Sequence, residues 1–173
     1  MVAAAWSTSH NQTELGTLYS KSELEAIAHV CKEHEVKLFV DGARLAYALA
    51  CPENDVTLAD LAQLCDAFYI GGTKCGAMFG EAVVIPNPRL LPHMTTIIKQ
   101  HGALLSKGRL LGIEFDELFK DHLYDTIGQD AITYANQIRQ ACKKAGLPLY
   151  FENPTNQIFC LVTKEQMKKH LRK

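Results

Sequence analysis

Two residues of opposite charge, Asp41 and Lys74, each follow an apolar run that is predicted to be a strand. Ligands of an open α/β sheet bind beyond the carboxyl ends of its strands, so these side chains are expected to be neighbours in space. A lysine shielded by apolar residues loses its proton more readily, because desolvation disfavours the charged form. An uncharged amine is what a Schiff base with an aldehyde requires.

The aspartate suggests which aldehyde this would be. An ionised carboxylate beside a heterocyclic nitrogen keeps that nitrogen protonated and turns the ring into an electron sink. Gly71, Gly72 and Gly76 flank the lysine and would let the backbone pass close to a ring or a phosphate. Taken singly, an Asp-Gly turn and a solvated loop lysine are the commoner explanations. At the ends of two successive strands, Asp41 and Lys74 together favour a pyridoxal phosphate site.

Other site types find less support in the sequence. The segment "GGTKCG" has the spacing neither of a P-loop nor of a dinucleotide-binding fingerprint. None of the six cysteines forms a C-x-x-C pair, and the histidines complete no zinc spacing, so no metal site is predicted. Cys75 follows the lysine, but no partner histidine can be assigned to it, and a packed thiol is the preferred interpretation.

Composition indicates a soluble globular domain. The 173 residues are 47% hydrophobic and 21% charged, with 18 basic and 19 acidic side chains. This balance favours neither a nucleic acid nor an anionic membrane surface as a partner. No uninterrupted apolar segment is long enough to cross a bilayer, and the apolar start is too short for a secretory leader. Scattered cysteines without a pairing pattern favour free thiols and a cytoplasmic location.

The first half of the chain alternates helix and strand signals. Ser20 and Glu23 have the spacing of a capping box, and apolar residues then recur on one helical face. Val36–Val40 is predicted to be a strand covered on both sides, because polar residues do not alternate within it. Thr57 with Asp60 starts a short helix, and "AFYI" is the next strand. This order predicts an α/β fold with a mostly parallel sheet.

The second half is predicted to be mainly helical. Val83–Ile85 is a further candidate strand, and residues 89–146 have a helical pattern with four glycines as interruptions or turns, namely Gly102, Gly108, Gly112 and Gly128. "PLYF" and "QIFCLVT" then indicate two strands around an Asn-Pro-Thr-Asn turn, followed by the start of a basic helix.

Four segments give the chain a specific resemblance: "NQTELGTLYSKSELEAI", "LFVDGARLAYAL", "YIGGTKCGAMFGEAVV" and "KQHGALLSKGRLLGIEFDELF". They resemble the threonine aldolase and aromatic amino acid β-eliminating lyase family, which has the aspartate aminotransferase-like fold of pyridoxal phosphate enzymes. The resemblance implies that Lys74 binds the cofactor aldehyde and that Asp41 pairs with the pyridine nitrogen. It places Ala43 against the ring, Thr73 near the phosphate and Arg44 on the substrate carboxylate.

The resemblance also implies a function and an organisation. The expected reaction is aldol cleavage of L-threonine or L-allo-threonine to glycine and acetaldehyde, with β-elimination or decarboxylation as alternatives. Family members are longer and are homo-oligomers, so the chain resembles one truncated at both ends. Residues 11–100 would belong to the large cofactor-binding domain, and residues 101–173 to a helical connection and an incomplete α+β small domain. A non-catalytic homologue is the other interpretation. Lys107 and Arg109 are weaker candidates for phosphate or cross-subunit contacts, and positions on an exposed helix face are the alternative for both.

Overall fold

A four-stranded sheet forms the centre of the protein. The computed structural model describes residues 5–7 and 15–170. The strands β1 (Ala5–Ser7), β2 (Leu38–Val40), β3 (Ala67–Gly71) and β4 (Glu81–Val84) are neighbours in this order. The first three run parallel and β4 pairs antiparallel with β3, so the predicted α/β class is confirmed and the sheet is mixed. β1 lies in a segment for which no strand is predicted.

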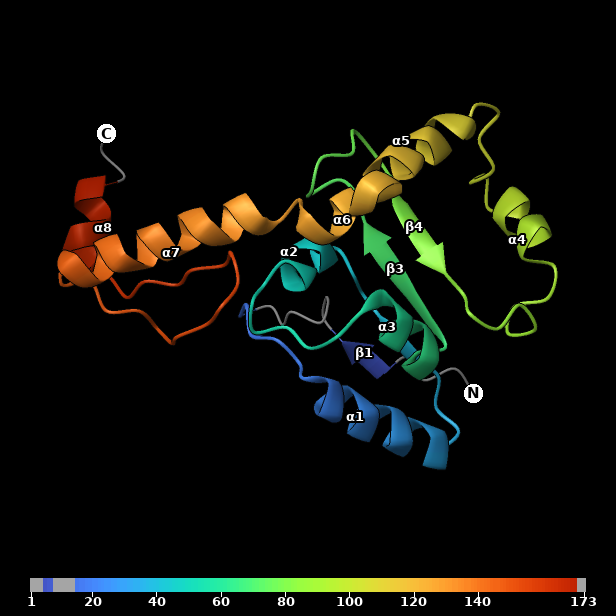
Figure 1. Ribbon diagram of the computed structural model, residues 1–173, viewed down its shortest axis with the longest axis horizontal. Coiled ribbons are helices and arrows are strands. Elements are labelled where there is room, and N and C mark those ends of the chain that lie inside the picture. The colour runs from blue at the N-terminus through green and yellow to red at the C-terminus, as the bar shows by residue number, and fades with distance from the viewer. Residues whose placement is uncertain (1–4, 8–14, 171–173) are drawn as a thin grey trace.

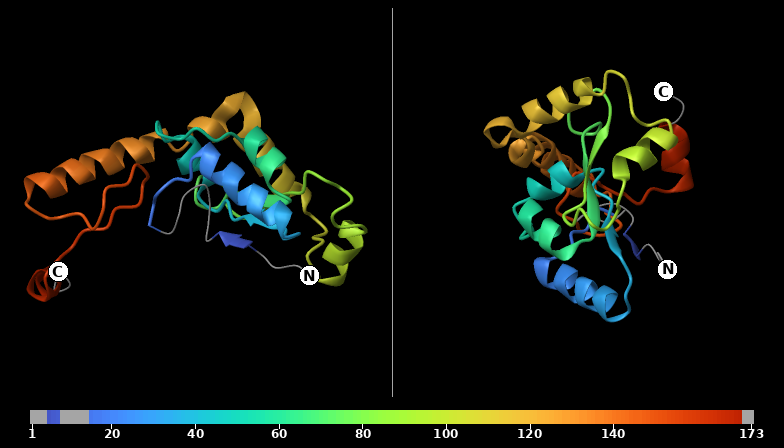
Figure 2. Two further views of the ribbon diagram at one scale, coloured as in Figure 1. Left: turned by 90° about the horizontal axis from the view of Figure 1, so that it is seen from below. Right: turned by 90° about the vertical axis from the view of Figure 1, so that its right-hand side faces the viewer.

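Some of the helices lie beside the sheet, and others extend beyond it. They are α1 (Lys21–Glu33), α2 (Leu45–Leu49), α3 (Leu58–Leu64), α4 (Met94–Gln100), α5 (Arg109–Phe119), α6 (Leu123–Thr126), α7 (Gln129–Lys144) and α8 (Lys164–His170), with a 3₁₀ turn at Lys120–His122. Figures 1 and 2 show α1, α2 and α3 on the same side of the sheet, while α7 leads away from it towards α8. Among the described helices, none combines the length and the apolar composition of a membrane span.

One face of the sheet packs against helices and contributes to the hydrophobic core. Val40, Phe68 and Ile70 are buried in a cluster that includes side chains of α1, α2 and α3. The opposite face carries Tyr69, which is half-buried, and its cross-strand partner Val83, which is 58% exposed. In β2, for which coverage on both sides is predicted, Leu38 and Val40 are buried and Phe39 is half-buried, so for the described residues only one face of this strand is fully covered. A continuous apolar run does not reveal by itself how many layers cover it.

The predicted capping boxes start two helices. In α1, the amide of Glu23 donates to the Ser20 hydroxyl, and the Glu23 carboxylate accepts from the Ser20 amide. Thr57 and Asp60 repeat this exchange at α3. Each box satisfies backbone amides that have no partner within the helix.

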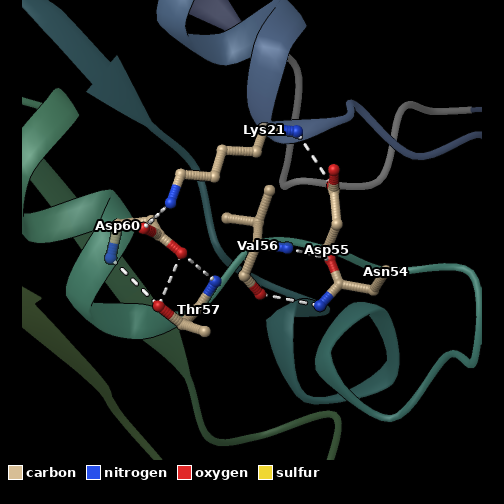
Figure 3. A network of polar contacts seen from close by, with 6 residues as sticks. All are labelled: Lys21, Asn54, Asp55, Val56, Thr57 and Asp60. Atoms are coloured by element: carbon tan, nitrogen blue, oxygen red, sulfur yellow. Dashed lines mark hydrogen bonds and ion pairs between the residues drawn. The ribbon is translucent and has the colours of Figure 1, made fainter.

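A polar network joins the starts of α1 and α3 (Figure 3). The Lys21 ammonium lies 2.7 Å from Asp60 Oδ1, and the Lys21 amide donates to Asp55 Oδ1 at 2.8 Å. Hydrogen bonds from Lys21 and from Thr57 lower the pKa of Asp60 to about 2. The ionised form of Asp60 is therefore the one that the folded state favours.

This network predicts an acid-dependent contribution to stability. Because the folded-state pKa is depressed from about 3.8 to about 2, the contribution is present above about pH 4 and is lost as the pH falls towards 2. We expect Asp60→Asn to lower the free energy of unfolding at pH 6, and the difference from wild type to shrink by pH 2. Urea unfolding at several pH values measures this, with the exposed Asp116→Asn as control. A difference independent of pH would contradict the prediction.

The C-terminal part differs from the sequence-based expectation in two ways. The segments "PLYF" and "QIFCLVT" form only an isolated antiparallel bridge, Leu149 to Cys160, and are not strands. Two short segments without further neighbours cannot extend a ladder. Gly112 lies within α5 and does not interrupt it, whereas Gly108 and Gly128 directly precede α5 and α7. The predicted C-terminal helix is present as α8.

A buried cluster attaches the segment after α7 to the rest of the protein. The Arg139 guanidinium donates to Asn153 Oδ1 at 3.1 Å and also to the Thr155 carbonyl oxygen. Asn153 Nδ2 donates to the Leu15 carbonyl oxygen at 2.9 Å, and the Thr155 hydroxyl donates to the Gly16 carbonyl oxygen at 2.8 Å. The two contacts with Leu15 and Gly16 join positions that are more than one hundred residues apart in sequence.

Thr155→Val tests this attachment, because it removes the hydroxyl with little change in volume. Thr155 is fully buried, so the variant leaves the Gly16 carbonyl without this donor in a buried place. We expect a loss of about 1–3 kcal/mol in the free energy of unfolding. Denaturant unfolding measures it. The exposed Thr95→Val in α4 is the control and should stay within about 0.5 kcal/mol of wild type.

Candidate active site

The loops that carry Asp41 and Lys74 lie together at one edge of the sheet. Asp41 directly follows β2, and Lys74 stands three residues after β3, which runs parallel to β2. The amide of Gly71 donates to the carbonyl oxygen of Gly42 at 2.9 Å. The backbone thus brings the two loops into direct contact, as the strand order predicts.

Two glycines make this contact possible. A Cβ atom at Gly42 would lie 1.8 Å from the Tyr69 carbonyl oxygen, and one at Gly71 would lie 2.5 Å from the Ala43 carbonyl oxygen. Neither distance is physically possible for a real side chain. The absence of a side chain at Gly71 is therefore explained by the packing of one loop on the other, and not by the approach of a ligand.

Hydrogen bonds orient the carboxylate of Asp41. The buried Ala43 donates its amide to Asp41 Oδ1 at 3.0 Å, and the phenol of Tyr69 hydrogen bonds to the same carboxylate. Burial, with a further contribution from Asp41, raises the pKa of Tyr69 above its usual value. The phenol therefore stays protonated at neutral pH and is the donor, which leaves Asp41 as the acceptor.

Lys74 lies in a turn and its side chain is exposed. The Tyr47 hydroxyl of α2 donates to the carbonyl oxygen of Lys74 and so fixes the backbone of this turn. The expectation that apolar neighbours shield the lysine is wrong for the described residues. Ile70 and Cys75, two apolar residues close to Lys74 in the sequence, are buried in the core instead.

Cys75 is a packed thiol, as predicted. It is buried and donates to the carbonyl oxygen of Gly71 at 3.2 Å. Burial raises the pKa of Cys75 to about 11. The thiol is protonated at neutral pH and is therefore a poor nucleophile.

A carboxylate that the sequence analysis missed holds the lysine loop. Glu81 Oε2 accepts from the Gly72 amide at 2.7 Å, and Glu81 Oε1 accepts from the Thr73 hydroxyl at 2.9 Å. A hydroxyl has a single proton to donate, so in this structure Thr73 donates it to Glu81. The only signal for this role in the sequence is an acidic residue at the start of the apolar segment "EAVV".

Arg44 lies three residues after Asp41 in the sequence. It is the half-buried residue before α2, and its side chain makes no capping hydrogen bond. A planar guanidinium can bind a carboxylate through two parallel hydrogen bonds. Lys107 and Arg109, the weaker candidates, are both exposed. No cluster of three or more potential metal ligands occurs among residues 5–7 and 15–170.

The sequence matches the model of a known protein family over most of its length. The model described as "Beta-eliminating lyase" matches residues 5–165, which is most of the chain. The chain belongs to the beta-eliminating lyase family. The residues around Asp41 and Lys74 and the whole sheet fall within the matched range.

Curated proteins similar to this family member carry threonine aldolase names. The chain is 38% identical over 111 residues to a low specificity L-threonine aldolase of Pseudomonas sp. (strain NCIMB 10558), covering 63% of this chain and 32% of that protein. It is 32% identical over 150 residues to the protein of the same name from Pseudomonas aeruginosa, covering 85% of this chain and 43% of that protein. The chain thus spans less than half the length of these relatives.

Solved structures agree with the family assignment. A threonine aldolase of Leishmania major superposes with a TM-score of 0.87 at 46% identity, covering 92% of this chain and 47% of that one. An aspartate aminotransferase of Thermus thermophilus superposes with a TM-score of 0.59 at 15% identity, covering 86% of this chain and 38% of that one. The second likeness shows that this beta-eliminating lyase family member shares the aspartate aminotransferase-like fold.

Proposed function

We propose that the protein is a pyridoxal phosphate-dependent carbon–carbon lyase that cleaves L-threonine or L-allo-threonine to glycine and acetaldehyde. One observation carries this proposal: the Gly71–Gly42 hydrogen bond holds the loops of Lys74 and Asp41 together at the carboxyl ends of β2 and β3. The family in general depends on this cofactor. The names of the two Pseudomonas relatives support the substrate class.

The chemistry of the available groups fits the cofactor. Asp41 offers a carboxylate that is already oriented by Ala43 and Tyr69, which suits a protonated ring nitrogen. Lys74 offers an exposed primary amine for an aldehyde. Ala43, which is proposed to lie against the ring, is small and donates its amide to Asp41.

Each residue then has a defined task. When bound, pyridoxal phosphate withdraws electrons from the substrate Cα and so weakens its bonds. Lys74 would hold the cofactor through its aldehyde carbon, and Asp41 would keep a proton on the ring nitrogen. Arg44 binds the substrate α-carboxylate and sets which Cα bond is broken. In the cleavage the Cα–Cβ bond would break, the β-hydroxyl would lose its proton as its carbon becomes the carbonyl of acetaldehyde, and Cα would keep the electron pair and gain a proton to give glycine.

Thr73 is proposed to bind the cofactor phosphate, for which its hydroxyl must give up an existing hydrogen bond. Its hydroxyl donates to Glu81, so binding a phosphate oxygen requires it to exchange one acceptor for another. Glu81 is itself negatively charged and would oppose a phosphate placed close to it. The contribution of Thr73 is therefore expected to be smaller than those of Lys74 and Asp41.

We extend the proposal to the organisation of the chain. Three of the described strands, β2, β3 and β4, lie within residues 11–100 and none lies within residues 101–170, which supports the assignment of residues 11–100 to the large domain and of residues 101–173 to the connection and small domain, while β1 precedes this range. Exposed apolar side chains such as Met78, Leu105 and Ile113 support assembly into a homo-oligomer, a dimer or a tetramer. The six free cysteines are consistent with the reducing cytoplasm.

A direct assay tests the proposed reaction. The protein is incubated with pyridoxal phosphate and with L-threonine or L-allo-threonine, and acetaldehyde and glycine are measured together. We expect both products in equal amounts. Ammonia with a keto acid would instead indicate elimination, and an amine with carbon dioxide would indicate decarboxylation. Either result, or the absence of any product, would contradict the proposal.

A non-catalytic homologue is the second candidate function. The exposure of Lys74 and the engagement of Thr73 by Glu81 are the observations that favour it. Thermal unfolding with and without pyridoxal phosphate separates the two candidates. A ligand of the native state must raise the midpoint temperature, whereas a protein without a site would show no shift.

A further inference from the structure

Two of the six cysteines lie next to each other in the C-terminal part of the chain. The Sγ atoms of Cys142, in α7, and Cys160 are 3.4 Å apart. Both residues are half-buried, whereas the other four cysteines are buried. A disulfide bond is about 2.05 Å long, so the sulfur atoms need to approach by about 1.4 Å. Small rotations of the two side chains can supply this displacement.

The backbone holds the two cysteines in this arrangement. The Leu147 amide donates to the Cys142 carbonyl oxygen at 2.9 Å, which closes the turn at the end of α7. Leu149 then pairs with Cys160 in the isolated antiparallel bridge, and the Tyr150 amide donates to the Phe159 carbonyl oxygen at 2.8 Å. These hydrogen bonds fix how the segment around Cys160 pairs with the segment that follows α7. The two thiols are therefore neighbours in the backbone arrangement that the structure already has.

We propose that Cys142 and Cys160 form a reversible disulfide in the folded protein and are a redox modification site. The oxidant is a low-molecular-weight disulfide such as oxidised glutathione. One cysteine thiolate attacks it, forms a mixed disulfide and releases one glutathione. The second cysteine attacks the mixed disulfide and releases the other glutathione. Two protein thiols are oxidised, one disulfide is reduced, and the two protons end on the departing glutathione sulfurs.

The bond would enclose the segment that attaches the C-terminal part to the rest of the protein. Asn153 and Thr155 lie between the two cysteines, and they contact Arg139, Leu15 and Gly16. A covalent link across the ends of this segment limits the ways in which it can open. Oxidation is therefore expected to stabilise the attachment of this segment, and reduction to the free thiols is expected to reverse that effect.

Glutathione titration of the folded protein is the test. The protein is equilibrated with buffers of increasing oxidised-to-reduced glutathione ratio, quenched with a thiol alkylating agent, and analysed by intact mass and peptide mapping. The hydrogen bond between the thiols raises the pKa of Cys160, so the incubation lasts for hours. We expect the loss of two hydrogen atoms, a Cys142–Cys160 cross-linked peptide, and a midpoint of thermal unfolding raised by about 5 °C.

Three variants make the result decisive. Cys142→Ser and Cys160→Ser should retain one glutathione on the remaining cysteine and show no rise in midpoint temperature on oxidation. Cys51→Ser is the control and should still form the bond, because a serine hydroxyl can also donate to the Pro154 carbonyl oxygen as Cys51 does. The proposal is overturned if glutathione stays on both cysteines, if other cysteines cross-link to the same extent, or if the bond forms only after denaturation.

Discussion

Replacing Gly42 with alanine is expected to unfold the protein or to destabilise it by about 3 kcal/mol or more. The added Cβ would lie 1.8 Å from the Tyr69 carbonyl oxygen, which belongs to the backbone of β3. No side-chain rotation can relieve such a contact. β2 and β3 would have to separate at the end where the Gly71–Gly42 hydrogen bond joins the two site loops. Denaturant unfolding followed by circular dichroism measures the effect.

Gly112→Ala is the matched control for this substitution. Gly112 is exposed within α5, and a Cβ there would have no neighbour within 4 Å. Because alanine is the better helix former, we expect this variant to be stabilised by about 0.5–1 kcal/mol. Equal destabilisation of both variants would show that the loop contact at Gly42 does not have the geometry described.

Replacing Lys74 with alanine is expected to abolish covalent cofactor binding while leaving the fold intact. Without the amine, added pyridoxal phosphate should produce no new visible absorbance band, and threonine cleavage should fall by at least about 10³-fold. Lys74 is exposed, so the midpoint of thermal unfolding without cofactor should stay close to that of wild type. Absorbance titration, product assay and thermal unfolding measure the three quantities.

Lys99→Ala serves as the control, because Lys99 is an exposed lysine of α4. It should retain both the absorbance band and the activity. Peptide mapping of the wild type after hydride reduction should then find the mass of the cofactor on the peptide that contains Lys74. Labelling of another lysine, or a band that persists in Lys74→Ala, would contradict the assignment.

Local signals in the sequence predicted much of the fold. The capping boxes at Ser20 and Thr57 depend on residues three positions apart, so they are visible without knowledge of the tertiary structure. The strands at Leu38–Val40 and Ala67–Gly71 follow from short apolar runs between turn residues. The segments around Leu149 and Cys160 have the same local pattern, yet they form only a bridge. A strand also needs a neighbour, and the local pattern does not supply one.

The candidate site divides in a similar way. Asp41 and Lys74 are predictable because their residue types and their places after strands have a chemical meaning, and the role of Arg44 is implied by the family resemblance. Glu81 and Tyr47 are not predictable, since their roles depend on contacts with Thr73, Gly72 and the Lys74 backbone across a turn. Neither the carboxylate at the start of a strand nor the tyrosine in a short helix belongs to a sequence spacing from which these contacts could be predicted.

The sequence by itself determined the family, the α/β class and the residues proposed for chemistry, because each of these depends on local pattern or on motif. Only the tertiary structure decided that Lys74 is exposed, that the Thr73 hydroxyl donates to Glu81, and that Cys142 lies 3.4 Å from Cys160. Exposure and hydrogen-bond partners depend on which distant segments meet. Residue type limits what a side chain can do, and packing selects which of those possibilities is used.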